Sequence, residues 1–146
     1  MIPRKRAKPR RRPANSCSVP RCKSHREKIA VGDRLLCSSH ALQEADRLFS
    51  LLVRAVAECE RCGKRDGLQC SHFISRRYLG TRWVRLNAEC LCVGCHKFLT
   101  ERPIEARDRA RELLGATVYD ELEDRARRFT GPVDYAAIIA NGGAQP

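Results

Sequence analysis

Residues 59–96 read CERCGKRDGLQCSHFISRRYLGTRWVRLNAECLCVGCH, and this stretch decides the fold. Two Cys-x-x-Cys pairs frame it, at a spacing that can hold one tetrahedral zinc ion through four thiolates. The two pairs consist of Cys59, Cys62, Cys92 and Cys95. A zinc ion with four thiolate ligands has no open position, so it stabilises the fold and takes no part in a reaction.

Three further polar residues lie inside this frame or directly after it: His72, Asn87 and His96. An imidazole, with an ordinary pKa of about 6.5, can take a proton from water at neutral pH, and it is also a common metal ligand. Two histidines on a zinc frame therefore suggest a metal-dependent nuclease. The alternative interpretation is that His72 is a strand residue without a role and that His96 competes with Cys95 for the structural zinc.

A second cluster precedes this frame, in the pattern C-x4-C-x14-C-x2-H. Its members are Cys17, Cys22, Cys37 and His40. Three thiolates and one imidazole are the ligand set of a closed structural zinc site. His25 is a rival fourth ligand outside the paired spacing, and buried cysteines without a metal are the other alternative. The sequence leaves open whether this module contacts DNA or only braces the fold.

The composition predicts a small apolar core. The chain has 146 residues, of which 5% are aromatic and 32% are charged. Proteins with thin cores usually depend on metals or disulfides. The N-terminus lacks the apolar segment of a secretory signal, and no apolar run approaches the ~20 residues of a membrane-spanning helix. We therefore expect a cytoplasmic protein without a membrane partner, whose cysteines bind zinc instead of forming disulfides.

The distribution of charge predicts a nucleic-acid partner. Of the net charge of +12, residues 1–16 carry +7 and residues 59–99 carry +5, whereas residues 100–146 carry −2. Residues 1–13 alternate proline with basic residues, which predicts that residues 1–16 form a disordered arm that contacts phosphates. A solubilising tail or a nuclear import signal is the alternative. The predicted phosphate contacts of the arm are Arg4, Lys5, Arg6, Lys8, Arg10, Arg11 and Arg12.

The patterning predicts a small zinc-stabilised α+β protein. Its expected parts are the arm (1–16), an N-terminal zinc module (17–40), a connecting helix (41–58), a nuclease core (59–102) and C-terminal helices (103–146). Within the core we expect a strand over 67–74, a return strand over 83–86 and a helix from Val93, which together form a ββα frame. Further helices are expected over 103–114, over 117–129 with Thr117 and Asp120 as a capping box, and after a cap at Asp134.

The segment from His72 to His96 resembles the HNH nuclease motif. More narrowly, CSHFISRRYLGTRW (70–83), Asn87 and CVGCHKFLTERP (92–103) resemble the NinG (Rap) recombination endonucleases of lambdoid phages and prophages. The likeness covers about residues 59–115 and extends to the basic opening of the chain. It implies a ββα-metal fold of the HNH or treble-clef type, and a metal-dependent endonuclease that hydrolyses branched DNA, such as Holliday junctions and D-loops, during phage recombination in the bacterial cytoplasm.

The resemblance also implies roles for the three polar residues. His72 would be the general base that activates water, and His96 would bind a catalytic Mg²⁺ or Mn²⁺ ion. Asn87 would orient the hairpin or supply a further ligand. A nuclease that cuts paired strands would be expected to form a homodimer, although the sequence contains no clear heptad pattern.

The stretch between His72 and Asn87 is basic, and its arginines are candidates for phosphate contacts. These are Arg76, Arg77, Arg82 and Arg85. Trp83 could stack on an unpaired base or pack against the hairpin. Two cysteines, Cys70 and Cys90, remain outside both clusters, and we expect them to be buried thiols.

One position departs from the HNH pattern. The residue before the base is usually an aspartate, or a second histidine, that binds the catalytic metal ion, but here it is Ser71. The ion would then depend on His96, Asn87, water and substrate phosphate, or on an acid from elsewhere, such as Asp66 or Glu89. Two alternative functions stay open: a nucleic-acid-binding zinc protein without catalysis, and an HNH nuclease with a role in genome packaging or in a mobile element.

Overall fold

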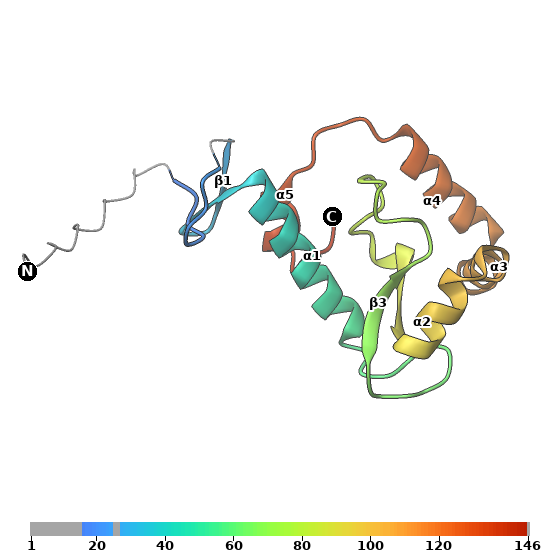
Figure 1. The fold of residues 1–146 in the computed structure, drawn as a ribbon. Coiled ribbons are helices and arrows are strands. Elements are labelled where there is room, and N and C mark those ends of the chain that lie inside the picture. Colours follow the sequence, from blue (N-terminus) through green and yellow to red (C-terminus); the bar gives the residue numbers. More distant parts are fainter. Residues whose placement is uncertain (1–15, 25–26, 146) are drawn as a thin grey trace, which may run out of the picture.

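A computed structural model describes residues 16–24 and 27–145. Within these ranges the chain forms two separate two-stranded antiparallel sheets and five α-helices, which is a small α+β architecture (Figure 1). The predicted phosphate contacts of the N-terminal arm, and the rival zinc ligand His25, lie outside the described residues.

The first sheet is a short hairpin that leads directly into the longest helix. Strands β1 (Lys28–Val31) and β2 (Arg34–Cys37) are joined by the Gly32–Asp33 turn, and helix α1 (Ser38–Arg54) begins at the next residue. The helix therefore starts three residues before the predicted segment (41–58) and ends four residues before its end. It buries one residue in every four, and these are Ala41, Ala45, Phe49 and Val53.

The second sheet is the centre of the fold. Strand β3 (Leu68–His72) pairs with β4 (Ala88–Cys92), with Leu68 opposite Cys92 and His72 opposite Ala88. The predicted return strand over 83–86 is wrong. Trp83 lies in a turn, and a single 3₁₀ turn (Arg85–Asn87) follows it. The true return strand is buried at all five positions, so it lacks the alternation that marks a half-exposed strand.

The remaining helices wrap around this hairpin and return to the N-terminal part. Helix α2 (Val93–Thr100) follows β4, as predicted, and α3 (Pro103–Leu114) has the predicted bounds. Helix α4 (Ala116–Arg128) and the short α5 (Tyr135–Ala140) complete the chain. In Figure 1, α3 and α4 lie on the side of the hairpin away from α1, and the chain then crosses back so that α5 lies beside α1.

The two predicted helix caps have opposite outcomes. The Asp134 side chain accepts a hydrogen bond from the backbone N–H of Ala137, so it caps α5 as predicted. The capping box at Thr117 and Asp120 is wrong, because α4 has no side-chain cap bond at its start. Asp120 instead accepts two hydrogen bonds from Arg111 of α3, at 2.8 and 3.1 Å, and this pair links the two helices.

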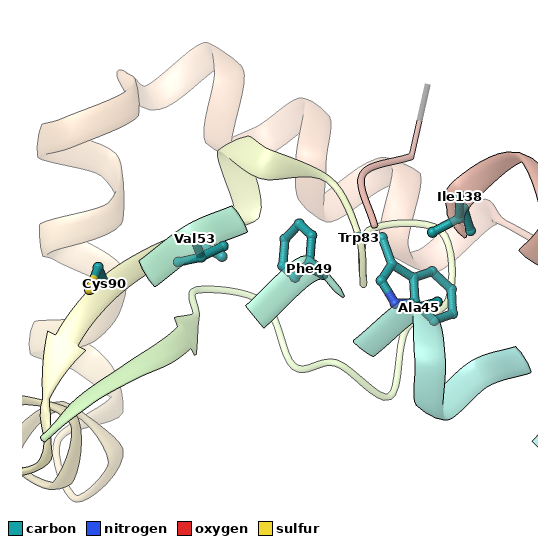
Figure 2. Close-up of a cluster of buried hydrophobic side chains, with 7 residues drawn as sticks. Ala45, Phe49, Val53, Trp83, Cys90 and Ile138 are labelled. Carbon is teal, nitrogen blue, oxygen red and sulfur yellow. The ribbon is translucent and has the colours of Figure 1, made fainter. Parts of the chain in front are cut away.

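The main core lies between α1, the central hairpin and α5. Figure 2 shows it as a row of side chains with Cys90 at one end, then Val53 and Phe49 of α1, and Trp83 and Ile138 at the other end. Trp83 is fully buried, so it packs in the interior and is not available to stack on a base. Its indole Nε1 donates a 3.0 Å hydrogen bond to Asp46 of α1, which satisfies the buried polar atom.

Among the described residues, no helix combines the length and the apolar character needed to cross a membrane.

The contact between α1 and the segment that follows α5 depends on a glycine. Gly143 has φ +96°, and a Cβ added there would overlap the backbone of Leu48 and Phe49. Gly142 has φ +68°, but no atom lies within 4 Å of a Cβ added there. We therefore predict that Gly143→Ala lowers the free energy of unfolding by about 3 kcal/mol, from backbone strain and overlap together. Gly142→Ala should cost only about 1 kcal/mol, from the left-handed backbone alone.

Urea denaturation followed by the fluorescence of Trp83 measures both effects. Equal losses in the two alanine variants would contradict the close approach of the chain end to α1.

Candidate functional site

The central four-cysteine cluster is assembled as predicted. The sulfur atoms of Cys59, Cys62, Cys92 and Cys95 all lie within 4.8 Å of one another. The Sγ atoms of Cys62 and Cys92 are 3.7 Å apart. A tetrahedral zinc ion with Zn–S bonds of about 2.3 Å holds its sulfurs about 3.8 Å apart, so the cluster has the dimensions of a zinc site.

The N-terminal cluster is assembled in the same way. The ligand atoms of Cys17, Cys22, Cys37 and His40 lie within 4.8 Å of one another. His40 presents Nδ1, which is 3.3 Å from the sulfur of Cys17 and 3.2 Å from that of Cys37. The sulfurs of Cys22 and Cys37 are 3.9 Å apart. Each of the two clusters could therefore hold one zinc ion, and both predicted ligand sets are confirmed as spatial clusters.

The two clusters share one local design. In each, the last cysteine of a hairpin is the N-cap of a helix, and another ligand follows three residues later in the first helical turn. Cys37 and His40 do this on β2 and α1, and Cys92 and Cys95 do it on β4 and α2. The N-terminus of a helix favours negative charge, so this position suits a thiolate ligand.

Hydrogen bonds lower the pKa of two cysteines in each cluster, Cys17 and Cys37 in one and Cys59 and Cys92 in the other. Burial by itself raises the pKa of the Cys37 thiol, but the backbone N–H of His40 and neighbouring side chains outweigh it and lower the pKa to about 6. Burial also opposes ionisation of Cys59, and there the backbone N–H groups near Cys92, Arg61 and Cys62 lower the pKa to about 6. Thiolates are the form that binds a metal ion.

His72 is half-buried at the end of β3, and its ring is held by one defined hydrogen bond. Nε2 lies 2.9 Å from the backbone carbonyl oxygen of Arg82. A carbonyl oxygen only accepts, so Nε2 carries the proton and Nδ1 has the lone pair, with the Cys70 sulfur 4.0 Å away. The Phe49 ring packs 5.5 Å from the imidazole, centroid to centroid. Burial lowers the pKa of His72 below its ordinary value, against the opposing effects of the Arg82 carbonyl and of Asp46.

His96 is oriented by a partner that the sequence did not reveal. It stands in the first turn of α2, and its Nδ1 lies 2.5 Å from the side-chain oxygen of Gln69 on β3. Nδ1 is therefore the donor, and Nε2 is left with a free lone pair. Metal-binding histidines are usually held this way, by a hydrogen bond from the ring nitrogen that does not contact the metal.

The two histidines line the same groove. A cavity of about 730 Å³ on one side of them is also lined by Asp46, Arg54 and Arg76. A second cavity, of about 350 Å³, is also lined by Ser71, Glu89 and Arg107. Because His72, Ser75, His96 and Thr100 line both cavities, the two adjoin along the histidines.

Asn87 does not reach this groove, because it is fully buried beneath the loop that follows β3. Its side-chain oxygen accepts a 2.8 Å hydrogen bond from the backbone N–H of Ile74. Its side-chain nitrogen donates to the backbone carbonyls of Ile74 and Thr81, at 3.0 Å each. The amide is thus fully used in tying both ends of the loop together. Of the two roles considered for Asn87, the one that orients the hairpin fits this geometry.

The residues considered for the missing acid are in different places. Asp66 is exposed in the loop before β3 and lines neither cavity. Glu89 is directly opposite Ser71 across the hairpin and has only 3% of its surface exposed. Its carboxylate accepts hydrogen bonds from Arg109 of α3, the shortest at 2.8 Å.

Two of the four loop arginines are engaged inside the protein. Arg82 donates two hydrogen bonds to Asp46, at 2.8 and 2.5 Å, and a third to the carbonyl of Arg76. Its predicted contact with phosphate is replaced by this internal pair. Arg85 donates to the backbone carbonyl of Ala88 at 2.5 Å. Arg76 and Arg77 are exposed, and Arg76 stands at the rim of the larger cavity.

Sequence reasoning missed Asp46 and Gln69. Asp46 lies on α1, where the helical periodicity shows only that it is on the polar face. Gln69 lies on β3, where the sequence shows only a polar residue between two less polar ones. Each is significant because of a partner more than 25 residues away along the chain. A single sequence carries no signal for such pairs.

We predict that the purified protein contains two zinc ions per chain. Cys22→Ser and Cys62→Ser should each lower the content to one ion, because each removes a ligand from a different cluster. Cys70→Ser, which changes a half-buried cysteine outside both clusters, should keep two. Elemental analysis of the dialysed variants measures this. One zinc ion in the unmodified chain, or two in either ligand variant, would contradict the assignment.

No family model, curated protein or solved structure matches the chain. The functional assignment therefore rests on the residues of the groove and on their contacts.

Proposed function

We propose that this protein is a metal-dependent DNA endonuclease with an HNH-type ββα-metal core. The observation that carries the proposal is the pairing of His72 and His96 along one groove, where the hydrogen bond of each ring leaves its other nitrogen unprotonated. Both zinc clusters are structural in this proposal. Neither has an open position for a substrate, since each has four protein ligands.

His72 is suited to act as the general base. The Arg82 carbonyl leaves Nδ1 unprotonated, and burial against Phe49 keeps the imidazole neutral at pH 7. A neutral imidazole can take a proton from the water that attacks phosphorus. Cys70, whose sulfur is 4.0 Å from Nδ1, stays a neutral thiol because burial raises its pKa to about 11, so its S–H is a weak donor to Nδ1 that an attacking water would displace.

His96 is suited to bind the catalytic ion, Mg²⁺ or Mn²⁺. Gln69 fixes the ring so that Nε2 is the free donor atom. When bound, such an ion supplies the positive charge that stabilises the developing charge on the phosphate and on the leaving oxygen. Thr100, one turn further along α2, also lines both cavities.

Cations on both sides of the histidines support a polyanionic substrate. Arg76 lines the larger cavity and Arg107 the smaller one, and both are exposed. They are suited to hold phosphates on either side of the scissile bond. The basic arm adds sequence-independent affinity in this proposal. The choice of branched DNA, and of a phage or prophage source, follows from the resemblance of residues 70–83 to the NinG enzymes.

A non-catalytic nucleic-acid-binding zinc protein is the second candidate. The observation that favours it is Ser71, since a hydroxyl is a poor ligand for a hard cation. The same groove and arginines would then bind DNA without cutting it.

The test uses the full chain with a labelled four-way junction and a matching linear duplex. We predict cleavage of the junction with Mg²⁺ or Mn²⁺ and none without added divalent ion. His72→Ala should lower the rate by about 100-fold or more while junction binding is kept. Glu121→Gln, an exposed change on α4, is the matched control and should cleave at the unmodified rate.

The other outcomes are informative. Junction binding without cleavage under any metal would leave the non-catalytic zinc protein. Cleavage of the linear duplex at one sequence would favour the other alternative, an HNH nuclease with a role in genome packaging or in a mobile element.

The pH dependence tests His72 separately. A general base works when it is neutral, and the pKa of His72 is lowered by burial. We therefore predict that kcat/KM for junction cleavage stays level at pH 7 and falls on acidification only below about pH 6.5, the ordinary value for histidine. The measurement covers pH 5–8 and includes the zinc content at each pH. An acid limb centred above pH 7 would contradict this assignment of the base.

A further inference from the structure

We propose that Glu89 supplies the carboxylate ligand of the catalytic cation, from the strand opposite the position where Ser71 stands in place of an acid. This inference rests on the proposed nuclease function and assigns a residue that its mechanism lacks. It also explains why strand β4, which is buried at all five positions, contains an acidic residue.

The register of the hairpin brings Glu89 next to the position of Ser71. Ser71 and Glu89 are direct partners in the antiparallel pair β3–β4. The side chains of direct partners project from the same face of the sheet, with Cβ atoms about 5 Å apart. The carboxylate of Glu89 therefore lies on the face of the sheet where an acid at position 71 would lie. The glutamate side chain is long enough to cover the distance between the two strands.

The smaller cavity brings Glu89 and His96 to one site. The cavity of about 350 Å³ is lined by Ser71, His72, Glu89 and His96 together. One carboxylate and one imidazole, with water and substrate phosphate in the other positions, form an ordinary ligand set for Mn²⁺ or Mg²⁺. The other acids are less suitable. Asp66 lines neither cavity, and both oxygens of Asp46 are engaged, Oδ1 by Arg82 and Trp83 and Oδ2 by Arg82 at 2.5 Å.

The contacts of Glu89 engage one carboxylate oxygen more closely than the other. Arg109 donates to Oε2 at 2.8 and 3.0 Å, but it reaches Oε1 only at 3.2 Å. Oε1 therefore retains most of its capacity as a ligand. Arg109 also donates to the backbone carbonyl of Glu60, so its guanidinium is anchored independently of the carboxylate. Only 4% of the Glu89 side-chain surface is exposed, and a carboxylate buried to this degree needs a positively charged partner, which is Arg109. The cavity beside this pair leaves room for a second cation, the metal ion.

The experiment measures Mn²⁺ affinity of the zinc-loaded full chain without DNA. Free Mn²⁺ is followed by its electron paramagnetic resonance signal during titration. Glu89→Gln keeps the shape of the side chain but removes its charge, and the dissociation constant for Mn²⁺ should rise at least about tenfold. His96→Ala should weaken Mn²⁺ binding to a similar degree. Glu105→Gln, on the exposed face of α3, should leave the affinity unchanged.

Arg109→Gln separates a ligand from a purely structural ion pair. It breaks the same pair as Glu89→Gln, so both variants should melt at a lower temperature than the unmodified chain. Under the proposal Arg109→Gln binds Mn²⁺ at least as tightly as the unmodified chain, because the competing cation is gone. Mn²⁺ should also raise its melting temperature more than that of the unmodified chain.

The outcomes distinguish this inference from the proposed function. Unchanged Mn²⁺ affinity in Glu89→Gln, or equal losses in Glu89→Gln and Arg109→Gln, would overturn the role of Glu89 while junction cleavage could still occur. Weaker Mn²⁺ binding in Glu89→Gln alone would support the ligand even if no DNA were cut, in which case the nuclease function would fail separately. The absence of any Mn²⁺ binding by the unmodified chain would also overturn the inference.

Discussion

The fold depends on the closure of the four-cysteine cluster. Two of its ligands precede β3, one ends β4 and one lies in the first turn of α2, so closure joins the open ends of a hairpin whose connecting loop is long. A two-stranded sheet is marginal by itself in water. Clamping it at the cluster fixes β3 relative to the first turn of α2, and these two elements carry His72 and His96. The same cluster that takes no part in the proposed reaction therefore determines where the reacting groups lie.

A second constraint comes from Asp46 of α1. Its carboxylate accepts from both Arg82 and Trp83, which are neighbours in the loop between the strands. The carbonyl of Arg82 in turn accepts from His72, so the orientation of that imidazole is coupled to α1. Because α1 begins at the N-terminal cluster, both zinc modules contribute to the geometry of one groove. Asn87 completes the support by joining the two ends of the loop from beneath.

The sequence predicted well wherever the determining contacts are local. Cysteine spacing identified both clusters, and the start of α2, the bounds of α3 and the Asp134 cap all follow from neighbouring residues. It failed on the return strand, because β4 is buried on both faces and has no alternation, whereas residues 83–86 have the composition of a strand. It also could not choose between Asp66 and Glu89, since only the strand register shows which acid is opposite Ser71.

The sequence by itself thus determined which residues form the two Cys/His clusters, the α+β class, and His72 and His96 as the candidate reactive residues. Ligand spacing, helical periodicity and capping are short-range properties, and they can be read along the chain. The tertiary structure alone decided which nitrogen of each histidine is unprotonated, which arginines remain exposed and which carboxylates share a cavity with His96. Those properties arise from burial and from partners distant in the chain, where a polar group takes whichever donor or acceptor the packing brings within reach.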